Sequence, residues 1–163
     1  MNLEPSKSQL IKPQPIKPEY IVIDTNVLIS AGLLPNSKTA QVLVLAVTYF
    51  VIAQNDATWL ELETRIARPK FDAYFGDEGR LRHLIKIAQG IERFEISSAV
   101  QISKDKTDDK FVSLALDSGA KMIISGDQDL KDIRFFQGIE ILSPTHFFDR
   151  FNRVPTDFGF AKG

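Results

Sequence analysis

The chain has 163 residues, of which 44% are hydrophobic and 25% charged, and its formal net charge is -1. These values are typical of one globular domain with a full core, and the absence of cysteine excludes disulfides, thiolate metal sites and a cysteine nucleophile. The sequence has no apolar run long enough to span a membrane and no apolar signal-peptide core, so we expect a cytoplasmic protein that does not bind membranes.

The first 18 residues differ from the rest of the chain in composition. They hold four of the eight prolines, with lysines and polar residues between them. Such a segment buries too little apolar surface to offset the entropy of ordering it, so we predict a disordered or extended arm over residues 1–18. A folded domain is expected over residues 19–150, followed by a tail over residues 151–163.

From Tyr20 onward, short apolar runs alternate with helical patterns. The runs lack the polar alternation of a half-exposed sheet, which indicates strands buried on both faces. We predict strands over residues 20–23, 49–53, 94–96, 121–125 and 139–142. We predict helices from a Ser37 cap, from Asn55 or Asp56 to about Ala67, over 77–89, over 108–117, from about Asp129 and after Pro144. This alternation predicts right-handed crossovers and an α/β sandwich with a parallel sheet.

The helix predicted over residues 77–89 has an apolar stripe that we expect to face the core. The stripe consists of Leu81, Leu84, Ile85 and Ala88. His83 is then expected on an exposed flank, and His146 lies in the last predicted helix. Because neither histidine belongs to a nucleophile–base pattern, we expect surface or packing roles for both.

Two predicted strands end in acidic residues. Asp24 directly follows the strand 20–23, while Asp127 and Asp129 follow the strand 121–125 after Gly126. Parallel sheets bind ligands at the carboxyl ends of their strands, and hard divalent cations prefer carboxylate oxygen. Asp24 and Asp127 are therefore candidate metal ligands. A turn or helix cap explains Asp24 equally well, and Asp129 fits a plain helix start.

Further acids lie on the predicted helices. Glu61 stands beside the apolar stripe of its helix, but a pair with Arg65 at i, i+4 explains it without a function. Asp108 and Asp109 open a helix, where the dipole favours acids, so capping is the default interpretation. Their joint arrangement is more informative, because carboxylates that converge at strand ends need a cation to stay ionised together. Such a site suits metal-assisted phosphodiester hydrolysis.

Four motifs in this order resemble the PIN domain family, in particular VapC-type toxins, over about residues 20–148. They are IDTNVLIS at 23–30, Glu61-Leu62 leading into RPKF at 68–71, DDKF at 108–111 leading into LAL at 114–116, and IISGDQDL at 123–130. ILSP at 141–144, with Phe147 and Phe148, closes the resemblance.

The resemblance implies a three-layer α/β/α sandwich with a mostly parallel five-stranded sheet of order 3-2-1-4-5. It implies that Mg²⁺ or Mn²⁺ is bound by Asp24, Glu61, Asp108 and Asp127, with Asp129 as an accessory catalytic acid. Asn26 and Ser125 match positions that order the site. Asp109 stands where the family often has asparagine, and Ser125 where it often has threonine, but no acid of the quartet is lost.

The resemblance further implies a metal-dependent endoribonuclease that is the toxin of a toxin–antitoxin pair, with an RNA substrate, a small antitoxin partner and a homodimeric state. Two alternatives stay open: a nuclease of this fold that acts in ribosomal RNA processing or on structured DNA, and an inactive module that binds a metal or a partner. A nucleotide-binding domain is disfavoured because no glycine-rich loop follows the first strand.

Two groups of residues have open roles at this point. Six basic residues could line a phosphate track, although solvated helix faces are their commoner role: Arg65, Arg68, Lys70, Arg80, Arg82 and Lys86. Five phenylalanines near the C-terminus mark either a contact surface or internal packing: Phe147, Phe148, Phe151, Phe158 and Phe160.

Overall fold

The computed structural model describes residues 17–153, which contain a six-stranded sheet of order β3-β2-β1-β4-β6-β5. Neighbouring strands pair in parallel except β5, which runs antiparallel to β6. The strands are β1 (Tyr20–Ile23), β2 (Val51–Gln54), β3 (Ile91–Arg93), β4 (Met122–Ile124), β5 (Phe135–Phe136) and β6 (Ile139–Leu142). The predicted order is confirmed, with β5 added at the edge. A tight turn at Gln137 and Gly138, both with positive φ, joins β5 to β6.

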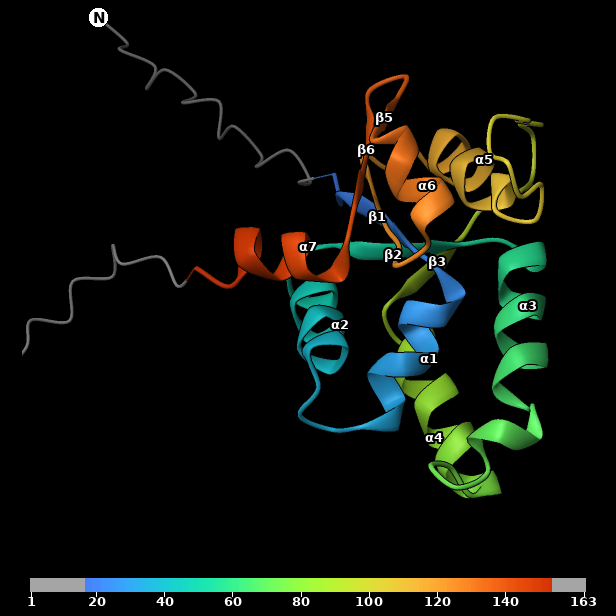
Figure 1. Cartoon of the computed structure of the whole chain (residues 1–163), viewed down its shortest axis with the longest axis vertical. Helices are drawn as coiled ribbons and strands as arrows, with labels where there is room; N and C mark the ends of the chain where they lie inside the picture. The colour runs from blue at the N-terminus through green and yellow to red at the C-terminus, as the bar shows by residue number, and fades with distance from the viewer. Residues whose placement is uncertain (1–16, 154–163) are drawn as a thin grey trace, which may run out of the picture.

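Helices cover both faces of the sheet (Figure 1). The first face carries α1 (Thr25–Leu33), α2 (Lys38–Tyr49), α3 (Asp56–Ile66), α4 (Asp77–Ala88) and α7 (Pro144–Phe151). The opposite face carries α5 (Asp109–Ser118) and α6 (Gln128–Ile133). A short 3-10 helix, Pro69–Phe71, follows α3. The expected three-layer α/β/α architecture is therefore confirmed.

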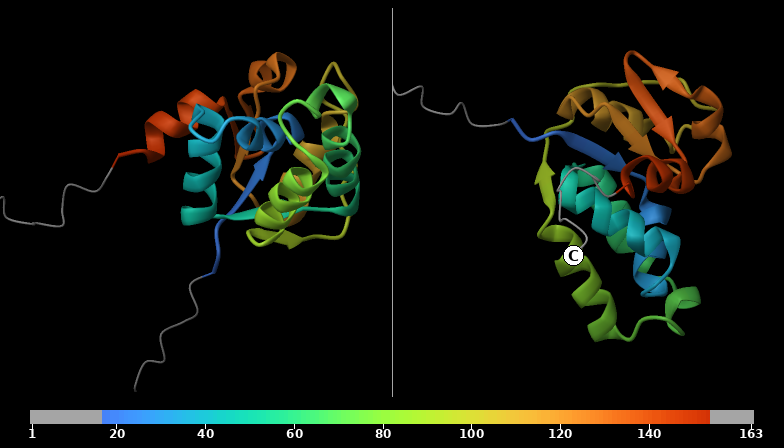
Figure 2. Two further views of the ribbon diagram at one scale, coloured as in Figure 1. Left: turned by 90° about the horizontal axis from the view of Figure 1, so that it is seen from below. Right: turned by 90° about the vertical axis from the view of Figure 1, so that its left-hand side faces the viewer.

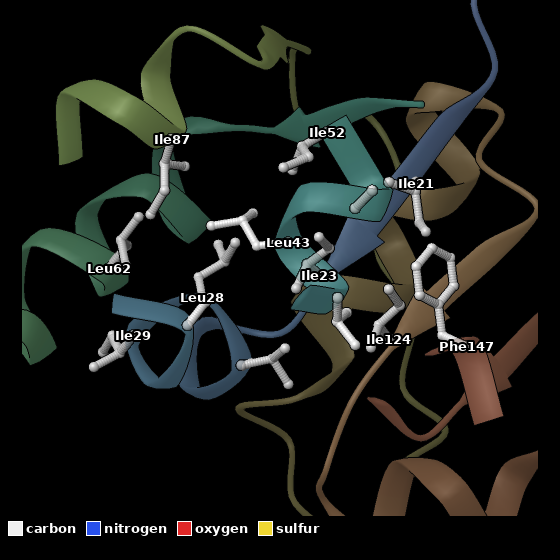
Figure 3. Packing of buried hydrophobic residues seen from close by; sticks show 14 of the residues in the cluster. Ile21, Ile23, Leu28, Ile29, Leu43, Ile52, Leu62, Ile87, Ile124 and Phe147 are labelled. Atoms are coloured by element: carbon white, nitrogen blue, oxygen red, sulfur yellow. The ribbon is translucent and has the colours of Figure 1, made fainter. Parts of the chain in front are cut away.

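Successive residues of a strand point to opposite faces of the sheet, so alternate residues belong to two separate cores. The first core, shown in Figure 3, includes Ile21, Ile23, Leu28, Leu43, Ile52, Leu62, Ile87, Ile124 and Phe147. The second core includes Val22, Ala53, Phe111, Leu114, Ile123 and Leu130. Because both faces are covered, β1 and β4 at the centre of the sheet contain only aliphatic or aromatic residues and methionine, which is the pattern that identified them in the sequence.

The parallel register places the carboxyl ends of β1 and β4 side by side. Ile23 is opposite Ile124, and the Asp24 backbone N–H donates to the Ile124 carbonyl oxygen at 2.8 Å. Helix α5 packs on both of these strands, and α3 contacts α5. Four segments that are distant in the sequence therefore meet at one edge of the sheet.

Three elements differ from the predictions. Helix α1 was not predicted; its sequence is apolar on several sides, and Thr25, Val27, Leu28, Ile29 and Ala31 are all buried, so it lacks a helical stripe. Strand β2 begins at Val51 rather than residue 49, because α2 continues to Tyr49. Strand β3 occupies Ile91–Arg93 rather than 94–96, since it pairs with β2 directly after Gly90.

The apolar stripe predicted for α4 is wrong except at Leu84, which is half-buried against the first core. His83 and Ile87 are buried, whereas Leu81 is 59% exposed and Ile85 49% exposed. The prediction of an exposed flank for His83 fails for the same reason. Its ring stacks on Phe75, and Nε2 donates to the Leu28 carbonyl oxygen at 2.7 Å. The side of the helix that carries His83 and Ile87 therefore faces the core, and Leu81 and Ile85 face solvent.

Helix α7 lies against α2 (Figure 2). Phe147 is fully buried and packs against Phe50 and Phe151, so these aromatic residues serve internal packing. Phe158 and Phe160, most of the predicted N-terminal arm and most of the predicted C-terminal tail lie outside the described residues. Within residues 17–153, no helix is both long and apolar enough to cross a membrane.

Candidate active site

One serine connects the acids that follow β1 and β4. Ser125 Oγ donates to Asp24 Oδ2 at 2.8 Å and accepts from the Asp127 backbone N–H at 3.0 Å. Ser125 is fully buried and Asp24 is 3% exposed. Asp24 also caps α1, since its Oδ1 accepts from the Asn26 backbone N–H at 3.2 Å, and Asp127 caps α6 through the Asp129 N–H at 2.8 Å. Capping therefore accounts for only one oxygen of Asp24.

Asp108 lies at the start of α5 but does not cap it. It makes no side-chain hydrogen bond to the helix end, it is 9% exposed, and its Oδ2 is buried without a partner. The neighbouring Asp109 accepts from the backbone N–H groups of Ile102 and Ser103, at 3.2 and 2.8 Å. Asp109 thus fixes the loop that leads into Asp108, and Asp108 itself is left without a structural explanation.

Three aspartates at this edge repel one another. Burial raises the pKa of Asp108 to about 6, and the charges of Asp127 and Asp24 add to the effect. Burial likewise raises the pKa of Asp24, while its hydrogen bonds to Ser125 and Asn26 oppose this. The charges of Asp24 and Asp127 act on Asp108, so the three side chains are near one another, and a cation among them would stabilise their ionised forms.

Glu61 belongs to a second group of charges beside the three aspartates. Its Oε1 lies 2.9 Å from Arg65 Nη2, as the i, i+4 spacing predicts, and its Oε2 contacts Lys110 Nζ. Neither oxygen receives a well-aligned hydrogen bond. Burial lowers the pKa of Lys110 and the charge of Asp24 raises it, so Lys110 is near both acids.

Sequence reasoning missed Lys110 and the second contact of Arg65. The Arg65 Nη1 group donates to Asn26 Oδ1 at 3.3 Å, which links α3 to α1. A signal for Lys110 was present in the sequence, because a cation in the first turn of a helix is disfavoured by the dipole. Asp129 is half-buried in the first turn of α6, where its backbone N–H binds Asp127.

The residues at this edge fit a divalent cation. The donors are carboxylate oxygens, which hard cations prefer, and the buried Asp108 Oδ2 lacks a protein partner. Within residues 17–153, no three acidic or histidine side chains stand close enough to hold one ion without rearrangement. Binding would therefore require the side chains of Asp24, Asp108 and Asp127 to rotate toward one another.

Two small hollows adjoin these residues. The first, about 330 Å³, is lined by Asp24, Asn26, Ser30, Thr39, Gly126 and Asp127, among others. The second, about 310 Å³, is lined by Glu61, Arg65, Arg68, Thr107 and Lys110, among others. A larger hollow of about 590 Å³ is formed by α1, α2, α4 and α7 and contains none of the predicted acids.

Several known proteins are similar to this chain in sequence or in fold. The family model described as PIN domain matches residues 20–129. The uncharacterized protein MJ1680 of Methanocaldococcus jannaschii is 30% identical over 116 residues, which cover 70% of this chain and 74% of that protein.

Two crystal structures have a similar fold. A chain from VapBC2 of Rickettsia felis, solved with a DNA fragment of its promoter, aligns with a TM-score of 0.54 and 15% identity over 76% of this chain and 98% of that one. PAE2754 from Pyrobaculum aerophilum aligns with a TM-score of 0.50 and 18% identity, over 82% and 96% of the two chains. With the family match covering most of the described residues, the chain belongs to the PIN domain family, a family of nucleases.

Proposed function

We propose that this protein is a metal-dependent endoribonuclease and the toxin of a toxin–antitoxin pair. The observation that supports the proposal is that Asp24, Asp108 and Asp127 come from three distant segments and lie near enough at one edge of the sheet for the charges of Asp24 and Asp127 to act on Asp108. These carboxylates repel one another, and the buried Asp108 Oδ2 has no partner. Without a ligand, such an arrangement costs stability, which favours a functional role over a structural one.

The proposed roles follow from the positions of the side chains. Asp24, Asp108 and Asp127 would hold Mg²⁺ or Mn²⁺. Ser125 connects two of these residues, because its hydroxyl binds the Asp24 carboxylate and the Asp127 backbone N–H. Glu61 would bind the ion or orient the attacking water, and Asp129 would support Asp127. When bound, such an ion lowers the pKa of a water molecule and stabilises the negative charge that develops on the leaving oxygen.

The proposed partner is a small antitoxin protein. The similar VapBC2 chain was solved as part of a VapBC2 assembly with promoter DNA. In this chain, the hollow between α1, α2, α4 and α7 is lined partly by apolar residues, including Ala31, Val44, Leu45 and Phe148, and gives such a partner a surface. A homodimeric state and a cytoplasmic location complete the proposal.

A panel of labelled nucleic acids tests the function directly. Structured RNA, single-stranded RNA and structured DNA are incubated with Mg²⁺, Mn²⁺ or EDTA, using the wild type, Asp24→Asn and the exposed control Asp149→Asn. We expect metal-dependent RNA cleavage that Asp24→Asn lowers by at least about 100-fold and that Asp149→Asn preserves. Equal rates for the wild type and Asp24→Asn would refute catalysis, and preferred cleavage of structured DNA would favour that alternative substrate.

A further inference from the structure

The hollow beside Glu61 is a cationic pocket. The pocket is lined by three basic side chains, Arg65, Arg68 and Lys110, by the carboxylate of Glu61 and by Thr107, whose hydroxyl donates to Asp105 Oδ1 at 2.7 Å. Lys110 and Arg65 both contact Glu61, so one negative charge is shared between two cations. Asp105, which is hydrogen-bonded to Thr107, adds a second carboxylate beside the pocket, so three cations face two carboxylates and an excess of positive charge remains.

Arg68 is the basic residue of this pocket that forms no ion pair within the described residues. In the described part of the chain, five other arginines each have a carboxylate within ion-pair distance: Arg65, Arg80, Arg82, Arg93 and Arg150. Arg68 has none there, and it is exposed beside Arg65 and Lys110. Within residues 17–153, Arg134 and Arg153 have no such carboxylate either, but they do not line this pocket. Of the six basic residues that the sequence offered for a phosphate track, Arg65 and Arg68 lie at this pocket, whereas Arg80 and Arg82 belong to α4 and pair with nearby acids.

The cationic pocket adjoins the acidic hollow. Asn26 lines the acidic hollow, Arg65 lines the cationic pocket, and the two side chains share a hydrogen bond of 3.3 Å. Lys110 is close enough to Asp24 for the charge of the aspartate to act on it. A negative hollow and a positive pocket thus lie next to each other around Asn26.

We propose that the cationic pocket formed by Arg65, Arg68, Thr107 and Lys110 binds a backbone phosphate of the nucleic acid beside the phosphate that is cleaved. The inference rests on the proposed nuclease function, since it places the cleaved phosphate at the three aspartates. A phosphodiester carries one negative charge and two free oxygens, which guanidinium and ammonium groups bind well. A phosphate here would also share Lys110 and Arg65 with Glu61.

A purely structural role for these residues makes a different prediction. If Lys110 and Arg65 serve only to join α5 to α3 through Glu61, their loss lowers stability without changing nucleic-acid binding. Arg68 would then have no role at all. The number of phosphate contacts separates the two cases, because each contact adds to the salt dependence of binding.

The test measures binding of a fluorescein-labelled single-stranded RNA by fluorescence anisotropy in EDTA, at a series of salt concentrations. The variants are Arg68→Gln, Lys110→Met and Lys110→Arg, and the matched control is Arg82→Gln, an exposed arginine on α4. For Arg68→Gln and Lys110→Met we expect weaker binding and a slope of log Kd against log salt that is smaller by about 0.7 each. Lys110→Arg and Arg82→Gln should keep the wild-type slope, and DNA of the same sequence should behave like RNA.

An unchanged slope in both Arg68→Gln and Lys110→Met, or no binding by the wild type at low salt, would overturn the inference. If circular dichroism reveals that Lys110→Met does not fold, Arg68→Gln decides alone, because this exposed side chain has no packing role. Binding is measured without metal and without cleavage. Cleavage with unchanged slopes would therefore reject only the phosphate pocket, and changed slopes without metal-dependent cleavage would reject only the nuclease proposal.

Discussion

Ser125 determines how Asp24 and Asp127 are placed relative to each other. Its buried hydroxyl donates to one aspartate and accepts from the backbone of the other. For Ser125→Ala we expect the free energy of unfolding to fall by about 1–2 kcal/mol, because two buried polar groups lose a partner. We also expect the affinity for Mn²⁺ to fall by about 10-fold or more. Urea denaturation and calorimetric titration measure the two effects.

Ser113→Ala is the matched control for this substitution. Ser113 is also buried on the edge of a core, and its hydroxyl accepts from the Val100 backbone N–H at 3.2 Å, away from the aspartates. Its loss should lower stability to a similar extent and leave Mn²⁺ affinity unchanged. Wild-type Mn²⁺ affinity in Ser125→Ala would show that the serine does not organise a metal site.

The raised pKa of Asp108 predicts a pH dependence of stability in EDTA. With a folded-state pKa of about 6 against an ordinary value of 3.8, the folded protein binds the proton more tightly than the unfolded chain. The contribution of Asp108 to stability is therefore greatest below the unfolded pKa and is lost as the pH rises through about 6. Because this side chain is partly screened by solvent, we expect a loss on the order of 1 kcal/mol.

Asp108→Asn isolates this contribution. The difference in unfolding free energy between Asp108→Asn and the wild type should grow in favour of the variant as the pH rises from about 4 to 7. Asp149→Asn, at an exposed position of α7, should follow the wild-type curve. Parallel curves for Asp108→Asn and the wild type would mean that burial and the neighbouring carboxylates do not raise the pKa of Asp108.

At the scale of elements, the contact between α1 and α4 depends on Gly32. A Cβ atom at this position would lie 2.6 Å from the His83 ring, which is held by Phe75 and the Leu28 carbonyl oxygen. We expect Gly32→Ala to lower the free energy of unfolding by about 1–3 kcal/mol through overpacking. Addition of His83→Ala should remove most of this effect, so that the two substitutions are not additive.

Gly79→Ala is the control for backbone effects in the same region. A Cβ atom there would meet only Phe75, at an ordinary 3.8 Å, so the substitution should be neutral or stabilising by up to about 1 kcal/mol. Thermal or urea denaturation of the three variants and the wild type provides the measurement. A fully tolerated Gly32→Ala would contradict the close packing of α1 on the His83 ring.

The elements differ in how well the sequence predicted them. The central strands were identified because burial on both faces removes polar residues from them, and Ser37 and Asn55 cap α2 and α3 as expected. Helix α1 was missed because its neighbours bury several of its sides. The prediction of which face of α4 is buried was wrong. His83 on the buried face donates a hydrogen bond to the distant Leu28 carbonyl oxygen, and no local sequence pattern contains that information.

At the scale of the whole molecule, the order of the strands creates the candidate site. Because β1 and β4 are neighbours in a parallel sheet, acids separated by about a hundred residues share one hydrogen-bonding serine. The sequence allowed the strand-end aspartates to be chosen, since their position relative to the strands is local. The dipole argument marks Lys110 as unusual, but its contact with Glu61 and the contact of Asn26 with Arg65 could not be predicted, because they exist only once α3, α5 and α1 are packed together.

The measurement that tests the central claim most directly is a calorimetric titration of the wild-type protein with Mn²⁺, repeated with Asp24→Asn, Asp108→Asn and Asp149→Asn. The account predicts saturable binding by the wild type and by Asp149→Asn, with affinity at least about 10-fold lower in the other two variants. No saturable binding by the wild type, or equal affinity in all four proteins, would contradict a cation site built from these aspartates.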